Sequence, residues 1–377
     1  MRNVFLNFRK QRIKLLILVV VLVSTIVAAA VYLPRLEQAN KGACGQCNFL
    51  LEWGSWGSGP GQFMFSYGVA VDYSGNVYVT DGGTSRVEKF TRSGTFITQW
   101  GSWGFGPGQF ISPRGIAVDL SGNVYVADFW NNRVEKFTGS GMFITQLGSW
   151  GSGPGQFNGP WSVAVDSSGN VYVADFWNSR VEKFTSSGTF VTQWGSLGSG
   201  AGQFNQPNGL AADLSGNIYV IDWGNVRVEK FTSSGAFITQ WGSSGFDAGQ
   251  FVGPVDVAVD SSGNVYVTDN GNNRVEKFTS TGSYITQWGS SGFRPGQFHG
   301  PRGVAVDSSG NVYVSDNGNS RVEKFGSVVI ISEEQVVLIS TIAVIVASVV
   351  AYLTIRKHPK NLRRRIRDHD VIRLAPL

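Results

Sequence analysis

Histidine and cysteine are scarce in this chain of 377 residues, which has three histidines and two cysteines. His358 and His369 lie near the C-terminal end, so only His299 falls in the middle of the chain. A zinc centre needs several histidine, cysteine or carboxylate ligands, and a disulfide-stabilised fold needs many more cysteines. The composition argues against both, and we expect neither a metal nor a cofactor.

Positive charge is also scarce outside the two ends of the chain. The whole sequence has a formal net charge of +5, yet residues 49–326 contain 16 Lys and Arg against 21 Asp and Glu, a net charge of −5. Nucleic-acid binding depends on a basic surface. We therefore expect no nucleic-acid partner for the central part of the chain.

Charged residues are absent from two long apolar stretches, residues 15–33 and 336–355. As helices, both are long enough to cross a bilayer. Basic residues cluster in the outer flanks, 1–14 and 356–377. The positive-inside bias then predicts two transmembrane helices in the cell membrane, with cytoplasmic termini and an extracytoplasmic centre. The alternative for 15–33 is a cleaved signal peptide, which would leave the new N-terminus extracytoplasmic.

Helical periodicity is absent between these stretches, and a repeat takes its place. Gly-Gln-Phe begins at residues 61, 108, 155, 202, 249 and 296, always 47 residues apart, which indicates a repeat architecture. In the first unit, residues 68–72, 76–81, 86–91 and 96–100 alternate like strands and are separated by turn residues. Four antiparallel strands per unit predict an all-β fold, a six-bladed β-propeller over residues 49–326.

The sixth unit ends without a fourth strand, whereas Phe49–Trp53 matches that missing strand. We predict that this N-terminal strand completes the last blade, because an unclosed ring would expose two strand edges. Linkers at 34–48 and 327–335 would then join the propeller to the apolar stretches. Alanine is the third residue of each predicted first strand, as a crowded inner strand requires: Ala70, Ala117, Ala164, Ala211, Ala258 and Ala305.

The repeated patterns are Pro-x-Gly-Val-Ala-Val-Asp, Gly-Asn-Val-Tyr-Val-x-Asp and Asn-x-Arg-Val-Glu-Lys-Phe. In these patterns the chain resembles NHL repeats, and the resemblance implies the NHL-type six-bladed propeller. It implies little about activity. Similar repeats are present in membrane kinase sensor domains, tripartite-motif RNA binders and peptidyl-hydroxyglycine lyases. A fold therefore does not determine a function.

Comparing the six units with one another separates structural from functional residues. A residue present in every blade serves the blade, as we expect for the pair Asp81/Arg86 and its five equivalents, in which an aspartate ends one strand and an arginine starts the next. In an antiparallel blade, the second-to-third and fourth-to-first connections lie on one face. Sequence variation concentrates in these connections, which we call the variable face. The other connections form the hairpin face.

The variable face is uneven around the ring. Residues that enter the innermost strand should lie at the mouth of the central channel, and aromatic side chains of blades two to four should form a shelf beside a polar rim. Such a surface suits a protein, peptide or glycan ligand. The predicted ligand-binding residues are Tyr67, Arg114, Trp130, Trp161, Trp177, Asn208, Trp223, Asp256, His299 and Arg302.

The sequence offers little support for the hypothesis that the domain is an enzyme. Asp256 is the only non-repeated acidic residue at the predicted channel mouth, and His299 is the only histidine of the repeat region. One carboxylate and one imidazole do not make a zinc site. We expect a domain without catalytic residues. A metal-assisted lyase or hydrolase of the NHL-propeller type that uses these two residues is the alternative.

Cys44 and Cys47 lie between the first apolar stretch and the propeller. Outside the cytoplasm we expect them to be oxidised. A local disulfide, inter-chain bridges that make a homodimer, and a redox or metal-binding pair remain open.

Taken together, these features favour a membrane-tethered extracytoplasmic propeller that binds a ligand or a protein partner, as a sensor, adhesion or scaffold module. A purely structural cell-surface protein is a second alternative.

Overall fold

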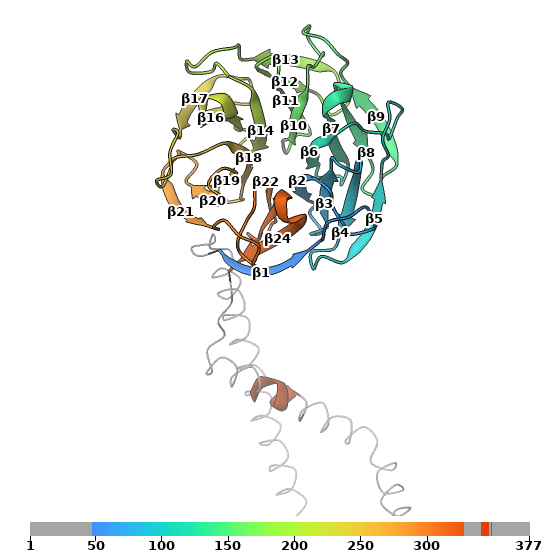
Figure 1. Ribbon diagram of the computed structural model, residues 1–377, viewed down its shortest axis with the longest axis vertical. Coiled ribbons are helices and arrows are strands. Elements are labelled where there is room, and N and C mark those ends of the chain that lie inside the picture. Colours follow the sequence, from blue (N-terminus) through green and yellow to red (C-terminus); the bar gives the residue numbers. More distant parts are fainter. Residues whose placement is uncertain (1–46, 328–340, 347, 349–377) are drawn as a thin grey trace, which may run out of the picture. The chain divides into compact units, whose positions relative to one another are not determined.

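The structure of the protein, a computed structural model, describes residues 47–327, 341–346 and 348. Residues 48–326 form six four-stranded antiparallel sheets arranged in a ring around a central axis (Figure 1). The predicted all-β six-bladed propeller is therefore confirmed.

Among the described residues, no helix is both long and apolar enough to cross a membrane. The predicted span 15–33 lies outside these residues. Of the predicted span 336–355, only 341–346 and 348 are described, and they are helical.

All six sheets repeat one strand pattern. In the first blade, β2 (Ser66–Val71) lies nearest the axis and is followed outward by β3 (Val77–Asp81), β4 (Arg86–Phe90) and β5 (Phe96–Trp100). The next two blades comprise β6 (Pro113–Val118), β7 (Val124–Asp128), β8 (Arg133–Phe137), β9 (Phe143–Leu147), β10 (Pro160–Val165), β11 (Val171–Asp175), β12 (Arg180–Phe184) and β13 (Phe190–Trp194).

The remaining blades comprise β14 (Pro207–Ala212), β15 (Ile218–Asp222), β16 (Arg227–Phe231), β17 (Phe237–Trp241), β18 (Pro254–Val259), β19 (Val265–Asp269), β20 (Arg274–Phe278), β21 (Tyr284–Trp288), β22 (Pro301–Val306), β23 (Val312–Asp316) and β24 (Arg321–Gly326). Short 3-10 turns follow the second strands of blades two, four and six. They are η1 (Phe129–Asn131), η2 (Trp223–Asn225) and η3 (Asn317–Asn319).

Two strands of the first blade start at different residues from those predicted. β2 begins at Ser66 rather than Gly68, because Ser66 pairs with Asp81 ahead of a β-bulge. β3 begins after Asn76, because the Asn76 main-chain N–H and side-chain amide donate to the Asp72 carboxylate at 2.8 and 2.7 Å. The alternation of apolar and polar residues in the sequence does not show where a β-bulge lies. It also does not show where a residue next to a strand hydrogen-bonds within a turn and so falls outside the strand.

The ring is closed by the N-terminal strand β1 (Asn48–Trp53), as predicted. β1 pairs antiparallel with β24, with Phe49 opposite Phe325 and Trp53 opposite Val322. The register shifts at Leu50, which lies at a bulge. Strands from opposite ends of the repeat region therefore form the last sheet together, and β24 has no free edge (Figure 1).

The repeated arginine ties each blade to the loop that enters it. In blade two, Arg133 Nε lies 3.0 Å from Asp128 Oδ2. The two terminal nitrogens of Arg133 donate to the carbonyl oxygens of Phe105, Gly106 and Gln109 at 2.6–2.9 Å. Four further blades contain the same ion pair: Asp175–Arg180, Asp222–Arg227, Asp269–Arg274 and Asp316–Arg321. In these five blades the structural interpretation of the pair is confirmed.

The first blade departs from this pattern. Arg86 pairs with Glu88, as the equivalent arginine does in the other blades, but its buried Nε has no hydrogen-bond partner among the described residues. The Asp81 carboxylate is bound by the Thr84 hydroxyl at 2.6 Å. Thr84 occupies the position of Asn131, whose longer amide bridges the aspartate and the entering loop in blade two. The Asp81–Arg86 ion pair is therefore absent from the first blade, although both side chains are buried and bond within the blade, as the structural interpretation requires.

The hydrophobic core lies between neighbouring sheets rather than at the axis. The ring of Tyr78 in blade one, for example, is fully buried in one cluster with Val124, Val126 and Phe137 of blade two. Equivalent clusters fill the other junctions. Each blade therefore depends on its neighbours for burial, as expected of a closed repeat fold.

Strand directions determine where the chain enters and leaves the ring. β1 begins at Asn48 and β24 ends at Gly326, and these two residues are paired. The third-to-fourth hairpins of the other blades occupy this end of the sheets, which is the hairpin face. The variable face is thus at the opposite end of the propeller from both chain connections.

Candidate functional site

Six first strands meet around the axis and define the channel mouth (Figure 1). A small cavity of about 20 Å³ lies there. Its lining consists of Tyr67, Gly68, Arg114, Gly115, Trp161, Ser162, Val255, Asp256, Arg302 and Gly303. Five of the ten predicted ligand-binding residues therefore line one cavity: Tyr67, Arg114, Trp161, Asp256 and Arg302.

The blades approach one another too closely at this point for larger residues in most positions. A Cβ atom on Gly115 would lie 2.5 Å from Cα of Ser162, and one on Gly303 would lie 2.5 Å from the carbonyl oxygen of Tyr67. The equivalent residue is a glycine in four of the six blades. Only blades three and five place a side chain here, Ser162 and Asp256, and those two side chains bond to the next blade.

Arg114 is held between two aromatic rings. Its guanidinium carbon lies 3.6 Å from the ring centroid of Phe129 and 3.6 Å from that of Trp161. Phe129 comes from the turn of the same blade, and Trp161 enters the first strand of the next blade. Cation–π contact of this kind is favourable and strongest when water is excluded. The rings fix the plane of the guanidinium, so only its edge, where the N–H groups lie, faces the channel.

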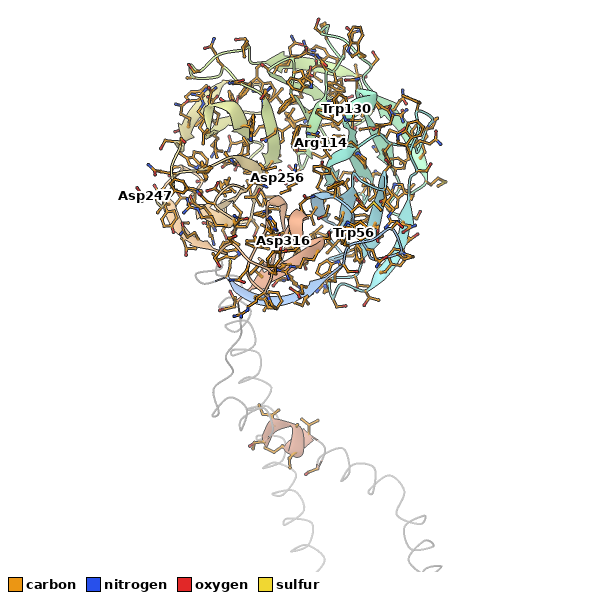
Figure 2. The ribbon with its side chains drawn as sticks, in the orientation of Figure 1. Trp56, Arg114, Trp130, Asp247, Asp256 and Asp316 are labelled. Carbon is orange, nitrogen blue, oxygen red and sulfur yellow. The ribbon has the colours of Figure 1, made fainter. Side chains whose placement is uncertain are left out.

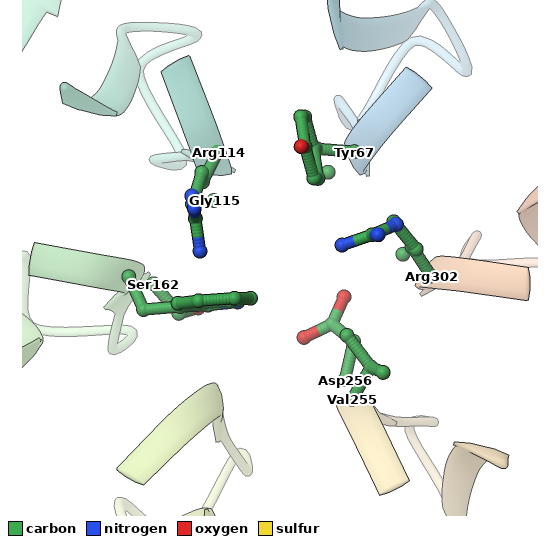
Figure 3. A pocket seen from close by; sticks show the side chains of 10 residues that line it. Tyr67, Arg114, Gly115, Ser162, Val255, Asp256 and Arg302 are labelled. Carbon is green, nitrogen blue, oxygen red and sulfur yellow. The ribbon is translucent and has the colours of Figure 1, made fainter. Parts of the chain in front are cut away.

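Arg302 approaches the same cavity from blade six. Its guanidinium carbon lies 4.6 Å from the ring centroid of Tyr67, whose ring is also 5.5 Å from the Arg114 guanidinium carbon. Figure 3 shows both arginines directed toward the space between the blades, with Tyr67 beside them. Burial and the charge of Arg302 lower the pKa of Arg114 to about 10, which leaves it cationic at neutral pH.

Asp256 faces the arginines from blade five (Figure 3). Its Oδ2 accepts a hydrogen bond from the Val304 main-chain N–H at 3.0 Å, which ties blade five to blade six. Burial raises the pKa of Asp256 to about 7, although main-chain N–H groups of Val304 and Val257 oppose that rise. In the described part of the chain, neither arginine lies within ion-pair distance of this carboxylate.

Asn208 contributes less to the mouth than the sequence predicts. Its side chain is buried, and its Oδ1 accepts a hydrogen bond from the Gly209 N–H at 2.8 Å. It does not line the cavity. Ser162, which the prediction did not include among the binding residues, lines it and accepts a hydrogen bond from the Leu210 N–H at 3.3 Å.

The predicted aromatic shelf lies farther from the axis. Trp130, Trp177 and Trp223 are between 42% and 58% exposed, so each keeps a large apolar surface in contact with solvent. Phe129 and Phe176 are buried and support the first two, with ring centroids 4.9 and 4.7 Å apart in edge-to-face contact. Trp161 stacks on Phe176 at 4.8 Å and joins the shelf to the channel mouth.

A second set of exposed aromatic residues was missing from the prediction. Trp56, Trp103 and Trp150, with Leu197 at the equivalent position of the next blade, are between 67% and 74% exposed. They belong to the fourth-to-first loops, so they lie on the variable face. Figure 2 shows Trp56 and Trp130 farther from the centre than Arg114 and Asp256. We call these four residues the outer track.

The outer track and the shelf are connected by hydrogen bonds between their loops. Asn131, next to Trp130, donates from Nδ2 to the carbonyl oxygen of Gly104 at 2.9 Å, and Gly104 follows Trp103. Asn178, next to Trp177, binds the Gly151 carbonyl oxygen in the same way at 2.9 Å. The comparison of blades could have identified the outer track, because the position reads Trp, Trp, Trp, Leu, Ser, Ser around the ring.

His299 lies apart from Asp256. It is exposed, its ring packs edge-to-face on Phe293 at 5.6 Å, and its main chain bonds to Asp316 and Gly318. Within the described part of the chain, no three His, Cys, Asp or Glu residues lie close enough together to hold a metal ion. Asp256 and His299 therefore do not fit the metal centre that a metal-assisted lyase or hydrolase would require.

The structure describes one of the two cysteines. Cys44 lies outside the described residues, and Cys47 is half-buried against the junction of blades five and six. The local disulfide, the inter-chain bridge and the redox or metal-binding pair all remain predictions.

Comparison with known proteins supports the fold. The NHL repeat matches residues 110–137, 157–184, 251–278 and 298–325. Comparison with curated proteins gives no match. One similar solved structure is a protein of unknown function from Bacteroides thetaiotaomicron, with 19% identity, a TM-score of 0.58, and coverage of 74% of this chain and 75% of that one.

Two enzymes are also similar in structure. A gluconolactonase from Xanthomonas campestris has 14% identity, a TM-score of 0.53, and coverage of 71% of this chain and 87% of that one. Virginiamycin B lyase from Staphylococcus aureus has 14% identity, a TM-score of 0.51, and coverage of 75% and 99%. Identities this low show the fold alone. The chain is a six-bladed β-propeller, and four of its six repeats match the NHL repeat.

Proposed function

We propose that this protein is a membrane-tethered, extracytoplasmic binding module that holds a protein, peptide or glycan partner on the variable face of its propeller. In this proposal, residues 15–33 and 336–355 anchor the chain, and the propeller serves as a sensor, adhesion or scaffold domain.

The tether is supported by the sequence and by the position of the chain connections. Both apolar stretches are free of charge and flanked by basic residues. Asn48 and Gly326, through which the chain enters and leaves the ring, are paired with each other on the hairpin face. Two anchors attached at this point would leave the variable face unobstructed by either connection.

The observation that carries the binding proposal is the uneven distribution of exposed tryptophans on the variable face, since the loops of blades five and six carry Phe246 and Phe293 but no tryptophan. Blades one to three provide the outer track tryptophans, while blades five and six have serine there. Blades two to four provide Trp130, Trp177 and Trp223. Structural needs repeat in every blade, so aromatic side chains that are exposed in some blades only are available for a partner. Large aromatic residues dominate the energetics of many binding sites.

The proposal is tested by screening the full chain, purified in a mild detergent, against glycan and envelope-peptide collections. For any partner found, the combined substitutions Trp130→Ala, Trp177→Ala and Arg302→Gln should weaken binding by roughly 100-fold or more, because hot-spot residues each contribute about 2 kcal/mol. The measurement is affinity by calorimetry, with thermal stability checked in parallel.

The matched control changes equally exposed apolar residues of the hairpin face. Tyr73, Leu120 and Leu214 are all more exposed than the shelf tryptophans. Replacing these three by serine should leave affinity unchanged. Equal binding by the shelf variant, or a comparable loss in the control, would place the binding surface elsewhere.

The enzymatic alternative has a separate test. A metal-assisted lyase or hydrolase would carry a stoichiometric divalent metal in the purified chain, measured by elemental analysis. The solved structures that share this fold include a lactonase and a lyase, yet Asp256 and His299 lie at different places here, and no observation on the variable face favours catalysis over binding.

A further inference from the structure

The channel mouth contains hydrogen-bond donors that the protein does not use. Nε and Nη1 of Arg114 and Nε of Arg302 are buried, and no residue in the described ranges accepts a hydrogen bond from them. Buried polar groups without a partner are rare, and each costs about 1–3 kcal/mol. At this one cavity, three such donors from two arginines are available to a water or to another acceptor from outside the chain.

The shape of the cavity limits how that acceptor enters. Its volume of about 20 Å³ accommodates one oxygen atom, so an acceptor larger than water enters with one oxygen and keeps its remainder outside the cavity. Phe129 and Trp161 cover both faces of the Arg114 guanidinium at 3.6 Å, so the acceptor must approach its edge. Carboxylate oxygens accept hydrogen bonds from N–H groups that lie in the guanidinium plane.

The charges at the mouth favour a single negative charge. Two guanidinium groups share the ring of Tyr67, at 5.5 and 4.6 Å, and their mutual repulsion contributes to the lowered pKa of Arg114. Asp256 is the only acidic residue of the lining, and one of its oxygens is already bound to the Val304 N–H. A planar monoanion would offset the excess positive charge. A tetrahedral dianion is bulkier and meets the Asp256 carboxylate at close range.

Both arginines are specific to their blades. The equivalent positions in the other four blades are Tyr67, Trp161, Asn208 and Val255, none of which is cationic. The guanidinium pair is therefore not a requirement of the propeller, and the aromatic clamp that orients Arg114 is built from residues of two neighbouring blades.

We propose that the channel mouth is a binding site for one carboxylate group of the ligand, held by the guanidinium edges of Arg114 and Arg302. The inference deepens the proposed binding function and rests on it for the rest of the ligand. A sugar acid and the C-terminus of a peptide both offer this group.

The test uses the full chain in detergent, labelled with nitrogen-15 at arginine. Glucuronate and N-acetylglycine are the carboxylate probes, and glucose and N-acetylglycinamide are their neutral counterparts. Carboxylate should shift the Nε–H signals of Arg114 and Arg302 saturably, with a dissociation constant of about 1 mM, a value expected for one small polar group. The neutral probes should leave both signals in place. The carboxylate probe that responds identifies the source.

Arg302→Gln should weaken the response to the carboxylate probe at least about 10-fold, as loss of a charge-assisted hydrogen bond predicts. Arg302→Lys keeps the charge but lacks the planar guanidinium, so its affinity for the carboxylate probe should lie between those of the wild type and Arg302→Gln. This second variant still tests the inference if Arg302→Gln does not fold. The inference is overturned if no carboxylate shifts these signals, if neutral probes shift them equally, or if phosphate binds as well as carboxylate.

The two proposals fail in different ways. If Trp130→Ala with Trp177→Ala leaves partner binding intact while carboxylate still shifts the arginine signals, the shelf is wrong and the carboxylate site stands. If partner binding needs the shelf but no carboxylate shifts the arginine signals, the binding proposal stands and the carboxylate site is wrong.

Discussion

Asp256 shows how a single residue at the axis can combine a structural and an electrostatic role. Its carboxylate bonds to the Val304 N–H of the next blade, and its surroundings raise its pKa to about 7. The folded protein thus holds this proton between about pH 4 and pH 7, where an unfolded chain has already lost it. Stability should therefore be greatest at low pH in this range and fall as the pH rises toward 7.

Asp256→Asn should remove this part of the pH dependence. A shift of this size corresponds to a change in the free energy of unfolding on the order of 2–4 kcal/mol between pH 4 and pH 7. Denaturant titrations at several pH values measure it, and the asparagine variant should show the flatter profile. Asp247→Asn, at an exposed loop position, is the matched control (Figure 2). A parallel profile for wild type and Asp256→Asn would contradict the assignment.

At the scale of the element, β1 decides whether the ring is closed. Its last residue, Trp53, pairs with Val322 and lies 5.8 Å from the Phe90 ring and 6.3 Å from the Tyr313 ring. One side chain thus contacts both the sixth and the first blade. Packing at this junction, together with the main-chain pairing, holds the ends of the repeat array together.

Trp53→Ala should destabilise the propeller by about 3 kcal/mol, as removal of a large aromatic side chain from a packed junction does. Trp56→Ala, three residues later, should change stability by less than about 0.5 kcal/mol, because that side chain is largely in solvent. Equilibrium denaturation of both variants provides the comparison. Equal losses, or none in Trp53→Ala, would show that the β1–β24 junction contributes little to closure.

At the scale of the whole molecule, the proposed tether predicts where the protein is found in cells. The full chain should sediment with membranes and resist extraction by alkaline carbonate, because two apolar helices insert stably into a bilayer. A variant lacking both 15–33 and 336–355 should appear in the soluble fraction. Release of the full chain by carbonate would refute membrane spanning and leave the propeller itself unaffected.

Much of the fold could be predicted because the chain repeats itself. The 47-residue period, the four alternating segments and the missing strand of the last unit lead to a six-bladed ring closed by Phe49–Trp53. Comparison of blades also separated Asp175/Arg180 and its equivalents from the variable positions. It did not reveal that the Asp81–Arg86 ion pair is absent, where Thr84 replaces the longer asparagine of the other blades.

The sequence by itself determined the architecture and which positions were available for binding, since both depend on what is repeated along the chain. Only the tertiary structure decided which of those positions meet. Arg114 is held by Phe129 of its own blade and Trp161 of the next, while His299 packs on Phe293 away from Asp256. Contacts of this kind depend on how the blades converge at the axis and on which side chains exclude water there. Neither can be predicted from the position of a residue within its repeat.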